Sequence, residues 1–456
     1  MNKLHNIYTE HKAYYTPLIK LGVPIIIGQL GIVATGLADT VMVGQHSTDE
    51  LAASSFVNNI IGTFLMLGTG YSFNLTPMIG RNLATGKKSA IGGWLKNSLI
   101  ANTFVALLIC SVLAVIYTNV ETLRQPEELL PLIRPYLAIS TVSLVFVMLY
   151  NSFRQFVEGI GNPTVSMWAL LIGNVLNIAG NYILIYGKLG FPELGLNGAG
   201  ISTFVSRLIT LAIFVAVFLY RSKYHPYRRG FALFRINAKQ IKRLNAIGWP
   251  IGVQQGIEAS TFSVTAIMVG WLGSAELAAH QVVIAISNIS FVIYLGLSSA
   301  VAIRSSYYKG AGDWKSVIRN TVSGVHLALV ASTIICIILF LTRTRVGHIF
   351  TDDIEVNLII VLLIPMLILY QLSDSVQLVL VHSLRGLADV KAIMWISFCS
   401  YFFGGMLSGY VFGFVFKWGI TGIWMAFPLG FLCCGILLWK RTRMLVNKNL
   451  KNKYTF

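Results

Sequence analysis

The chain has 456 residues, of which 55% are hydrophobic and only 11% are charged. This composition excludes an ordinary soluble globular protein, in which about a quarter of the residues are charged, and it indicates an integral membrane protein. A net charge of +18 at pH 7 would suggest a nucleic-acid partner in a soluble chain, but here the basic residues lie in short loops beside apolar runs, which argues against nucleic acid.

Twelve long apolar runs follow one another along the chain, each long enough to cross a bilayer as a helix. The runs are continuous rather than alternating, which favours helices over barrel strands. The polar start of the chain lacks the pattern of a cleaved signal peptide, so we expect the first run to be retained. The runs cover 18–43, 51–80, 95–117, 133–156, 164–187, 198–220, 244–270, 277–303, 318–341, 356–383, 391–416 and 420–439. The predicted fold is therefore an all-α integral membrane protein with twelve transmembrane helices.

The basic residues set the expected orientation. Of the 35 Lys and Arg, 28 lie at the two ends of the chain and in the loops after every second run. By the positive-inside rule, both termini are expected in the cytoplasm. Arg207, by contrast, lies near the middle of a run. The five cysteines lie in apolar runs without metal-ligand spacing, so we expect neither a disulfide framework nor a cofactor.

An internal duplication divides the twelve runs into two sets of six. GWPIGVQQ in the second half aligns with GVPIIIGQ in the first, and ELAA occurs in both. Because each half has an even number of runs, the copies are parallel repeats, with a substrate cavity expected between them. We predict an N-terminal lobe at 1–220, a basic cytoplasmic linker at 221–245 and a C-terminal lobe with a short basic tail at 246–456.

Three acids lie inside the apolar runs: Asp39, Glu258 and Asp374. An acid at the centre of a membrane helix costs about 2.5–3.5 kcal/mol, so such residues usually mark an ion or substrate path. The repeat alignment places none of the three opposite another acid. Duplication alone therefore does not explain them, and we expect the two lobes to hold different sites.

In the first lobe, Asp39 is expected near a run that carries Asn174, Asn177 and Asn181 on one helix face. Two structural interpretations remain open: Asp39 could reach towards water at the interface, and the asparagines could simply join neighbouring helices. The functional alternative is a polar pocket for a proton, a cation or a drug.

In the second lobe, Glu258 follows Gln254 by one turn, and Asp374 follows Tyr370 by one turn. Carboxylate, amide and phenol oxygens suit a hard cation such as Na⁺, which makes Glu258, Asp374 and Tyr370 a candidate metal site. The two acids could instead share one proton, or only stabilise the helix bundle.

Two prolines, Pro24 and Pro250, occupy equivalent positions in the repeats. Proline removes a backbone hydrogen bond and kinks a helix. Each kink could be architectural, or it could serve as a hinge for alternating access.

Five motifs together resemble the multidrug and toxic compound extrusion (MATE) transporters, and in particular their bacterial NorM-like branch: ADTVMVG, FRQFVEGIGNPT, LNIAGNYILIYG, ELAAHQ and YQLSDSVQLVLVHSLRG. The likeness extends from about residue 18 to 439. It implies two six-helix lobes around a central cavity in the bacterial inner membrane. It also implies export of cationic drugs and other organic cations in exchange for Na⁺ or H⁺.

The resemblance also implies roles for individual residues. Asp39 matches the acid of the N-terminal lobe, and Asn177 and Asn181 match the asparagine pair near it, whereas Asn174 has no clear counterpart. The cation site of the C-terminal lobe matches Glu258, Tyr370 and Asp374. Retention of both C-lobe acids favours Na⁺, although such a pair could equally carry protons.

The remaining expectations concern partners and rival functions. We expect a monomer whose partners are organic cations, the coupling ion and membrane lipid. The sequence has no HExxH, GxSxG or P-loop pattern, so we do not expect an enzyme. The alternative function is a lipid-linked oligosaccharide flippase of the same superfamily, which would need basic residues in its cavity to bind pyrophosphate, whereas the intramembrane charges here are mostly acidic.

Overall fold

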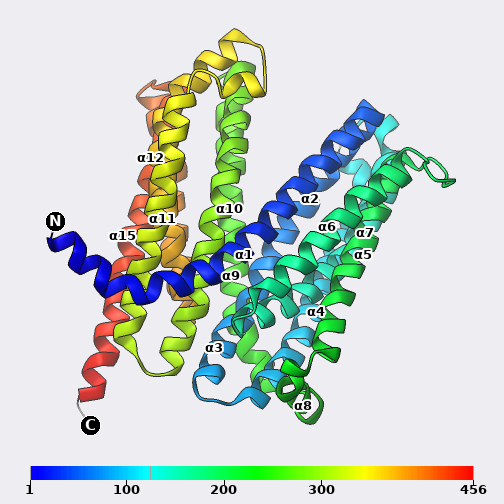
Figure 1. Ribbon diagram of the computed structural model, residues 1–456. Coiled ribbons are helices and arrows are strands. Elements are labelled where there is room, and N and C mark those ends of the chain that lie inside the picture. Colours follow the sequence, from blue (N-terminus) through cyan, green and yellow to red (C-terminus); the bar gives the residue numbers. More distant parts are fainter. Residues whose placement is uncertain (1, 124, 455–456) are drawn as a thin grey trace. The chain divides into compact units, whose positions relative to one another are not determined.

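The computed structural model describes the backbone of residues 2–123 and 125–454, and the side chains of 11–123 and 125–451. All regular structure in these ranges is helical (Figure 1), which confirms the predicted all-α fold. The extreme ends of the predicted lobes, at residue 1 and at 455–456, lie outside the described residues.

The helices of the first half match the predicted runs within a few residues at most ends. They are α1 (Asn2–His46), α2 (Thr48–Ser72), α3 (Thr76–Ala84), α4 (Lys88–Thr118), α5 (Leu130–Gly159), α6 (Pro163–Ile185) and α7 (Gly195–Tyr220). The second half contains α9 (Ala238–Gly270), α10 (Ser274–Gly310), α11 (Trp314–Thr342), α12 (Ile354–Gly386), α13 (Val390–Cys399), α14 (Ser408–Tyr410) and α15 (Gly419–Tyr454).

Short segments complete the backbone. The 3-10 turns are η1 (Phe73–Leu75), η2 (Val120–Leu123), η3 (Glu127–Leu129), η4 (Ser222–Tyr224) and η5 (Gly347–Ile349). Two π-helical segments, η6 (Ser400–Leu407) and η7 (Val411–Val415), alternate with α13 and α14 in one apolar span. The span passes close to α15, because a Cβ on Gly404 would lie only 3.0 Å from Gly430 Cα.

Eleven helical segments of the described chain are long and apolar enough to cross a membrane. The remaining predicted span, 244–270, corresponds to α9, which has 33 residues but is not among the eleven. Its polar side chains Gln254, Gln255 and Glu258 lie in the part that would cross the bilayer, and they lower its hydropathy. The predicted span that falls outside the eleven thus carries one of the three candidate site acids, Glu258.

The chain forms two compact units, one of residues 27–252 and one of residues 1–26 with 253–456. The helices α1 and α9 each pass from one unit to the other, two residues after Pro24 and Pro250. These bounds differ from the predicted lobes: residues 1–26 join the second unit, and the predicted linker 221–245 belongs to the first.

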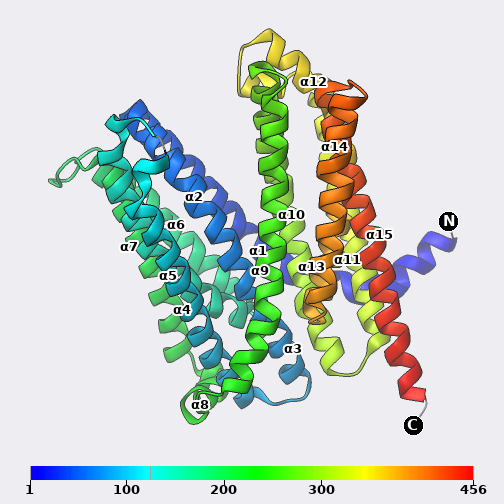
Figure 2. The same cartoon turned by 180° about the vertical axis from the view of Figure 1, so that it is seen from behind.

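The first unit is built on α2, α4, α5, α6 and α7, which pack along one another. The predicted linker contains a short helix, α8 (His225–Leu233), which packs on α4 (Figure 2). Glycines permit this close approach: a Cβ on Gly92 would lie 1.9 Å from Tyr227 O, and a Cβ on Gly230 would lie 1.8 Å from Ser89 O. The basic segment is therefore part of the folded unit.

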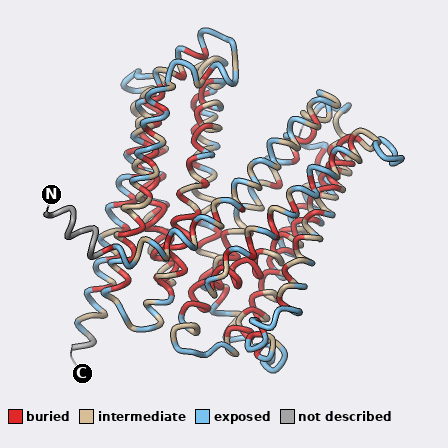
Figure 3. Tube along the Cα trace, in the orientation of Figure 1, coloured by how far each residue is buried: buried red, intermediate tan, exposed pale blue. Residues whose placement is uncertain are grey.

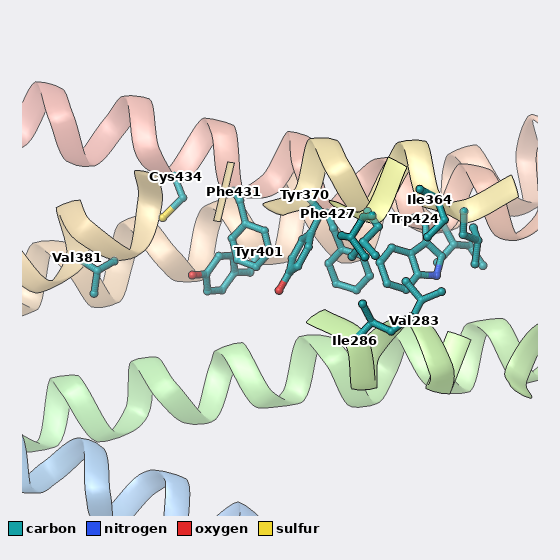
Figure 4. Close-up of a cluster of buried hydrophobic side chains, with 14 of the residues drawn as sticks. Val283, Ile286, Ile364, Tyr370, Val381, Tyr401, Trp424, Phe427, Phe431 and Cys434 are labelled. Carbon is teal, nitrogen blue, oxygen red and sulfur yellow. The ribbon is translucent and has the colours of Figure 1, made fainter. Parts of the chain in front are cut away.

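The second unit is built on α10, α11, α12 and α15. Its core includes a layer of rings from Tyr370, Tyr401, Trp424, Phe427 and Phe431, in which neighbouring ring centroids lie 5.2–6.5 Å apart (Figure 4). In each unit the buried residues lie where helices face one another (Figure 3). Many large apolar side chains on the outer faces are exposed, as expected for helices surrounded by lipid.

Candidate functional site

A cavity of about 200 Å³ lies inside the first unit, among α1, α2, α5, α6 and α7. Its lining includes two charged side chains, Asp39 from α1 and Arg207 from α7. The uncharged polar residues of the lining are Thr35, Tyr150, Asn174, Asn177, Thr203, Ser206 and Thr210. The cavity therefore combines opposite charges with many hydrogen-bonding groups.

The structure brings Asp39 together with two of the three asparagines of α6. Asn181 Nδ2 donates a hydrogen bond to Asp39 Oδ1. The amide of Asn177 lies between Asp39 and Thr203. When its nitrogen faces the carboxylate, it donates to Asp39 Oδ1 at 2.9 Å and its oxygen accepts from Thr203 Oγ1 at 3.0 Å. One face of α6 thus holds the carboxylate through two neutral amides.

The third asparagine, Asn174, lies on the same face but makes a different contact. It lines the cavity, and its Nδ2 atom has no hydrogen-bond partner among the described residues. It fits against Gly31 of α1, where a Cβ would lie 2.5 Å from Asn174 Nδ2. Asn174 therefore lines the cavity and makes no hydrogen bond to Asp39 among the described residues.

Arg207 was not among the residues assigned a function from the sequence. Its Nη1 atom donates to Ser143 Oγ on α5 at 2.5 Å, and Ser143 Oγ donates in turn to Ser140 O at 2.8 Å. The sequence signal was present, because Thr203, Arg207 and Thr210 recur at spacings of three and four on one face of a membrane helix.

In the second unit, Glu258 of α9 belongs to a hydrogen-bonded chain. Gln254 Nε2 donates to Glu258 Oε2 at 3.0 Å, and Arg385 Nη2 on α12 donates to Gln254 Oε1 at 2.5 Å. Gln254 is therefore the bridge between a carboxylate and a guanidinium. The one-turn spacing in the sequence predicted that Gln254 lies beside Glu258, whereas Arg385 was assigned no role.

Tyr370 and Asp374 lie one turn apart on α12. The ring of Tyr370 packs in the aromatic layer of Figure 4 and is 5% exposed. Asp374 is 1% exposed, and its Oδ2 atom has no hydrogen-bond partner in the described part of the chain. Both side-chain polar atoms of Gln371 lack partners as well among those residues. Since nearly all buried polar groups in proteins are paired, these atoms mark a place for water or a cation.

No hydrogen bond between described residues joins Glu258 to Asp374, although both belong to the second unit. Within those residues there is also no group of three or more His, Cys, Asp or Glu side chains that could hold a metal ion. A cation here would instead need carboxylate oxygen with amide and phenol oxygen, a donor set that suits Na⁺. Asp374, Gln371 and Tyr370 supply such oxygens.

Comparisons with known proteins bear on what these sites do. The family model MatE matches residues 24–183 and 250–411. The multidrug resistance protein MdtK of Proteus mirabilis is 29% identical over 443 residues, which cover 93% of this chain and 94% of that protein. The multidrug resistance protein NorM of Photobacterium profundum is 28% identical over 453 residues, which cover 96% of both chains.

Solved structures show the same fold. An outward-facing multidrug resistance MATE family transporter matches with a TM-score of 0.88 at 18% identity, covering 95% of this chain and 96% of that one. The MATE transporter VcmN of Vibrio cholerae, solved as a mutant, also gives 0.88 at 18% identity and covers 96% of this chain and 98% of that one.

Proposed function

The chain belongs to the MATE family, whose model matches both of its halves, and from this premise we propose that it exports cationic amphiphilic compounds in exchange for Na⁺ or H⁺ by alternating access. Family membership makes it a transporter and not an enzyme. Its many apolar helices and its bacterial relatives fit a multi-pass protein of the bacterial inner membrane. The proposal places both termini in the cytoplasm, on the basis of the loop charges.

The observation that carries the proposal is the buried carboxylate of Asp374. A carboxylate this deep in a membrane helix is costly unless a cation or a proton neutralises it. One of its oxygens has no partner among the described residues, and the side-chain oxygen of Gln371 has none either. These groups support a coupling-cation site that includes Asp374, Tyr370 and Glu258.

The proposed coupling follows from the charges. A cation that binds at Glu258 and Asp374, or a proton that binds at Asp39, favours the conformation that releases the drug outside. Coupling ion and drug each lower the affinity for the other, by linkage. One elementary charge that moves through 100 mV supplies about 2.3 kcal/mol. Pro24 and Pro250, next to the two crossings between the units, are the proposed hinges.

The alternative, a lipid-linked oligosaccharide flippase, has one observation in its favour. Arg207 lines the cavity of the first unit and could bind a phosphate. However, the cavity also contains Asp39, which would repel pyrophosphate. The full-length relatives are named as multidrug resistance proteins. These two observations favour the drug exporter.

The test is ethidium efflux from proteoliposomes with a Na⁺ gradient and a pH gradient imposed separately. Export driven by Na⁺ and lost in Glu258→Gln and Asp374→Asn would support the C-lobe site as the Na⁺ site. Export driven by the pH gradient alone and lost in Asp39→Asn would place proton coupling at Asp39. Normal efflux by all three variants at equal protein content would refute the assignment of these sites.

A further inference from the structure

We propose that Arg207 is a specificity-determining residue that binds an anionic group of the substrate. The cavity of the first unit would then prefer zwitterionic amphiphiles, which carry a cationic and an anionic group, over simple monocations. This inference rests on the proposed export function and names a substrate class for it.

The first argument is the charge of the cavity. Its lining contains one carboxylate, on Asp39, and one guanidinium, on Arg207. A monocation is attracted by the first and repelled by the second. A zwitterion gains from both when its ammonium faces Asp39 and its carboxylate faces Arg207. Poor screening inside a protein enlarges both effects.

The second argument is that the two charges are held apart by neutral partners. Asn177 and Asn181 hold Asp39, and the hydroxyl of Ser143 holds Arg207. Within the described residues, Asp39 and Arg207 do not form an ion pair with each other. Each charge can therefore meet a charge on the ligand without first breaking a strong internal pair.

The third argument is the geometry of the guanidinium. A planar guanidinium can donate two parallel hydrogen bonds to one carboxylate, which a flexible ammonium group cannot do with the same precision. Ser143 is fully buried and anchored to Ser140 O, so it fixes the Nη1 side of Arg207. The side chain lines the cavity in this fixed orientation.

The size of the cavity limits which part of a substrate it binds. Its volume of about 200 Å³ is below the roughly 300–1,000 Å³ of pockets that enclose drug-sized ligands. We therefore expect it to accept the charged end of an amphiphile, while the apolar remainder lies outside it.

The test compares two dyes that differ by one charge: rhodamine B, which has a free carboxylate, and its ethyl ester, which is a monocation. Efflux of each dye from proteoliposomes gives a KM for the wild type, Arg207→Gln and Arg207→Lys. Arg221→Gln, which removes an exposed guanidinium at the end of the same helix, is the matched control. Titration of each dye against purified protein in detergent gives dissociation constants that do not depend on turnover.

We expect the wild type to prefer rhodamine B. Arg207→Gln should raise the ratio of the zwitterion's KM to the ester's KM at least about tenfold, which corresponds to the lower end of one hydrogen bond to a charged group. Arg207→Lys should change the ratio less, and Arg221→Gln should leave it unchanged. Export of the ester by the variants also shows that they are folded.

Two results would overturn the inference. An equal rise in KM for both dyes would mean that Arg207 only supports the fold through its hydrogen bond to Ser143. A lower KM for the ester with an unchanged KM for rhodamine B would mean that Arg207 acts only as a counter-charge to Asp39. If the wild type exported neither dye, the export proposal would fail, and the dissociation constants would still decide the role of Arg207.

Discussion

Arg385 on α12 and Glu258 on α9 are linked through one amide, that of Gln254, which accepts from the guanidinium at 2.5 Å and donates to the carboxylate at 3.0 Å. A glutamine can do both at once because it carries an acceptor and a donor on one planar group. The link places a neutral amide between a positive charge and the carboxylate of Glu258.

Gln254→Leu should break this link. Each hydrogen bond to a charged group contributes about 1.5–3 kcal/mol, and a buried charge that loses its partner costs more. We expect a lower melting temperature in detergent and a weaker dependence of export on the coupling ion. Gln255→Leu is the matched control, because the side-chain oxygen of Gln255 has no partner among the described residues. Equal melting temperatures of the two variants, with an equal dependence of export on the coupling ion, would contradict a role for the link.

Na⁺ should stabilise the protein if it binds at Asp374. A ligand that binds only the folded state at 100 times its dissociation constant stabilises by about 2.7 kcal/mol. Thermal unfolding in NaCl, KCl and choline chloride at equal ionic strength measures this effect. The increase in NaCl should vanish in Asp374→Asn.

The control for that experiment is Asp389→Asn. Asp389 pairs with Arg441 at 2.6 Å, away from the proposed site, so its loss should lower stability but keep the response to Na⁺. An unchanged Na⁺ response in Asp374→Asn would remove Asp374 from the cation site.

The positions of Pro24 and Pro250 predict a kinetic effect. Each lies inside a helix that passes from one compact unit to the other. Alanine restores the missing hydrogen bond and stiffens the helix. We expect turnover to fall about three- to tenfold in Pro24→Ala and in Pro250→Ala, with drug affinity unchanged. Pro365→Ala, inside α12 and away from the crossings, should have a smaller effect on turnover.

The packing of α8 on α4 predicts an effect on stability. A Cβ on Gly92 would lie 1.9 Å from Tyr227 O and 2.5 Å from Phe231 N, so Gly92→Ala must displace backbone. Overpacking of this kind costs about 1–3 kcal/mol, which a melting curve can detect. Gly62→Ala is the control, because a Cβ there meets nothing within 4 Å. It should be neutral or slightly stabilising, since alanine favours helix.

The sequence predicted the membrane helices well because their signals are long and local. The run predicted at 164–187 is α6, which begins at Pro163, a residue that favours the first turn of a helix. The helix α8 was missed because nine residues rich in basic and aromatic side chains give no clear periodicity, and its contact with α4 depends on glycines distant in sequence.

The candidate sites were predicted only where their sequence signal is local. Asn177 and Asn181 share a helix face with a spacing that the sequence shows, and the structure places both on Asp39. Arg207 and Arg385 were assigned no role because no local pattern identifies the residues that they contact on other helices, Ser143 and Gln254. The functional roles of all these residues stay predictions.

The contact between Gly31 and Asn174 allows the cavity to be altered without removing a polar group. In Gly31→Ala the new methyl group would lie 2.5 Å from Asn174 Nδ2, and the amide has to turn away. Because this atom ends a short side chain, we expect a stability loss below about 1.5 kcal/mol. The new position of this amide would change the polar lining of the cavity, so export KM should rise up to about tenfold with little change in melting temperature.

Gly36→Ala is the matched variant for this prediction, because Gly36 lies on the same helix and also lines the cavity, yet a Cβ there meets nothing within 4 Å. An added methyl group alone should therefore change export less at position 36 than at position 31. If both variants raised KM equally, lost volume would explain the effect. If neither did, Asn174 would have no part in substrate binding, and Asp39 with Arg207 would be left as its charged determinants.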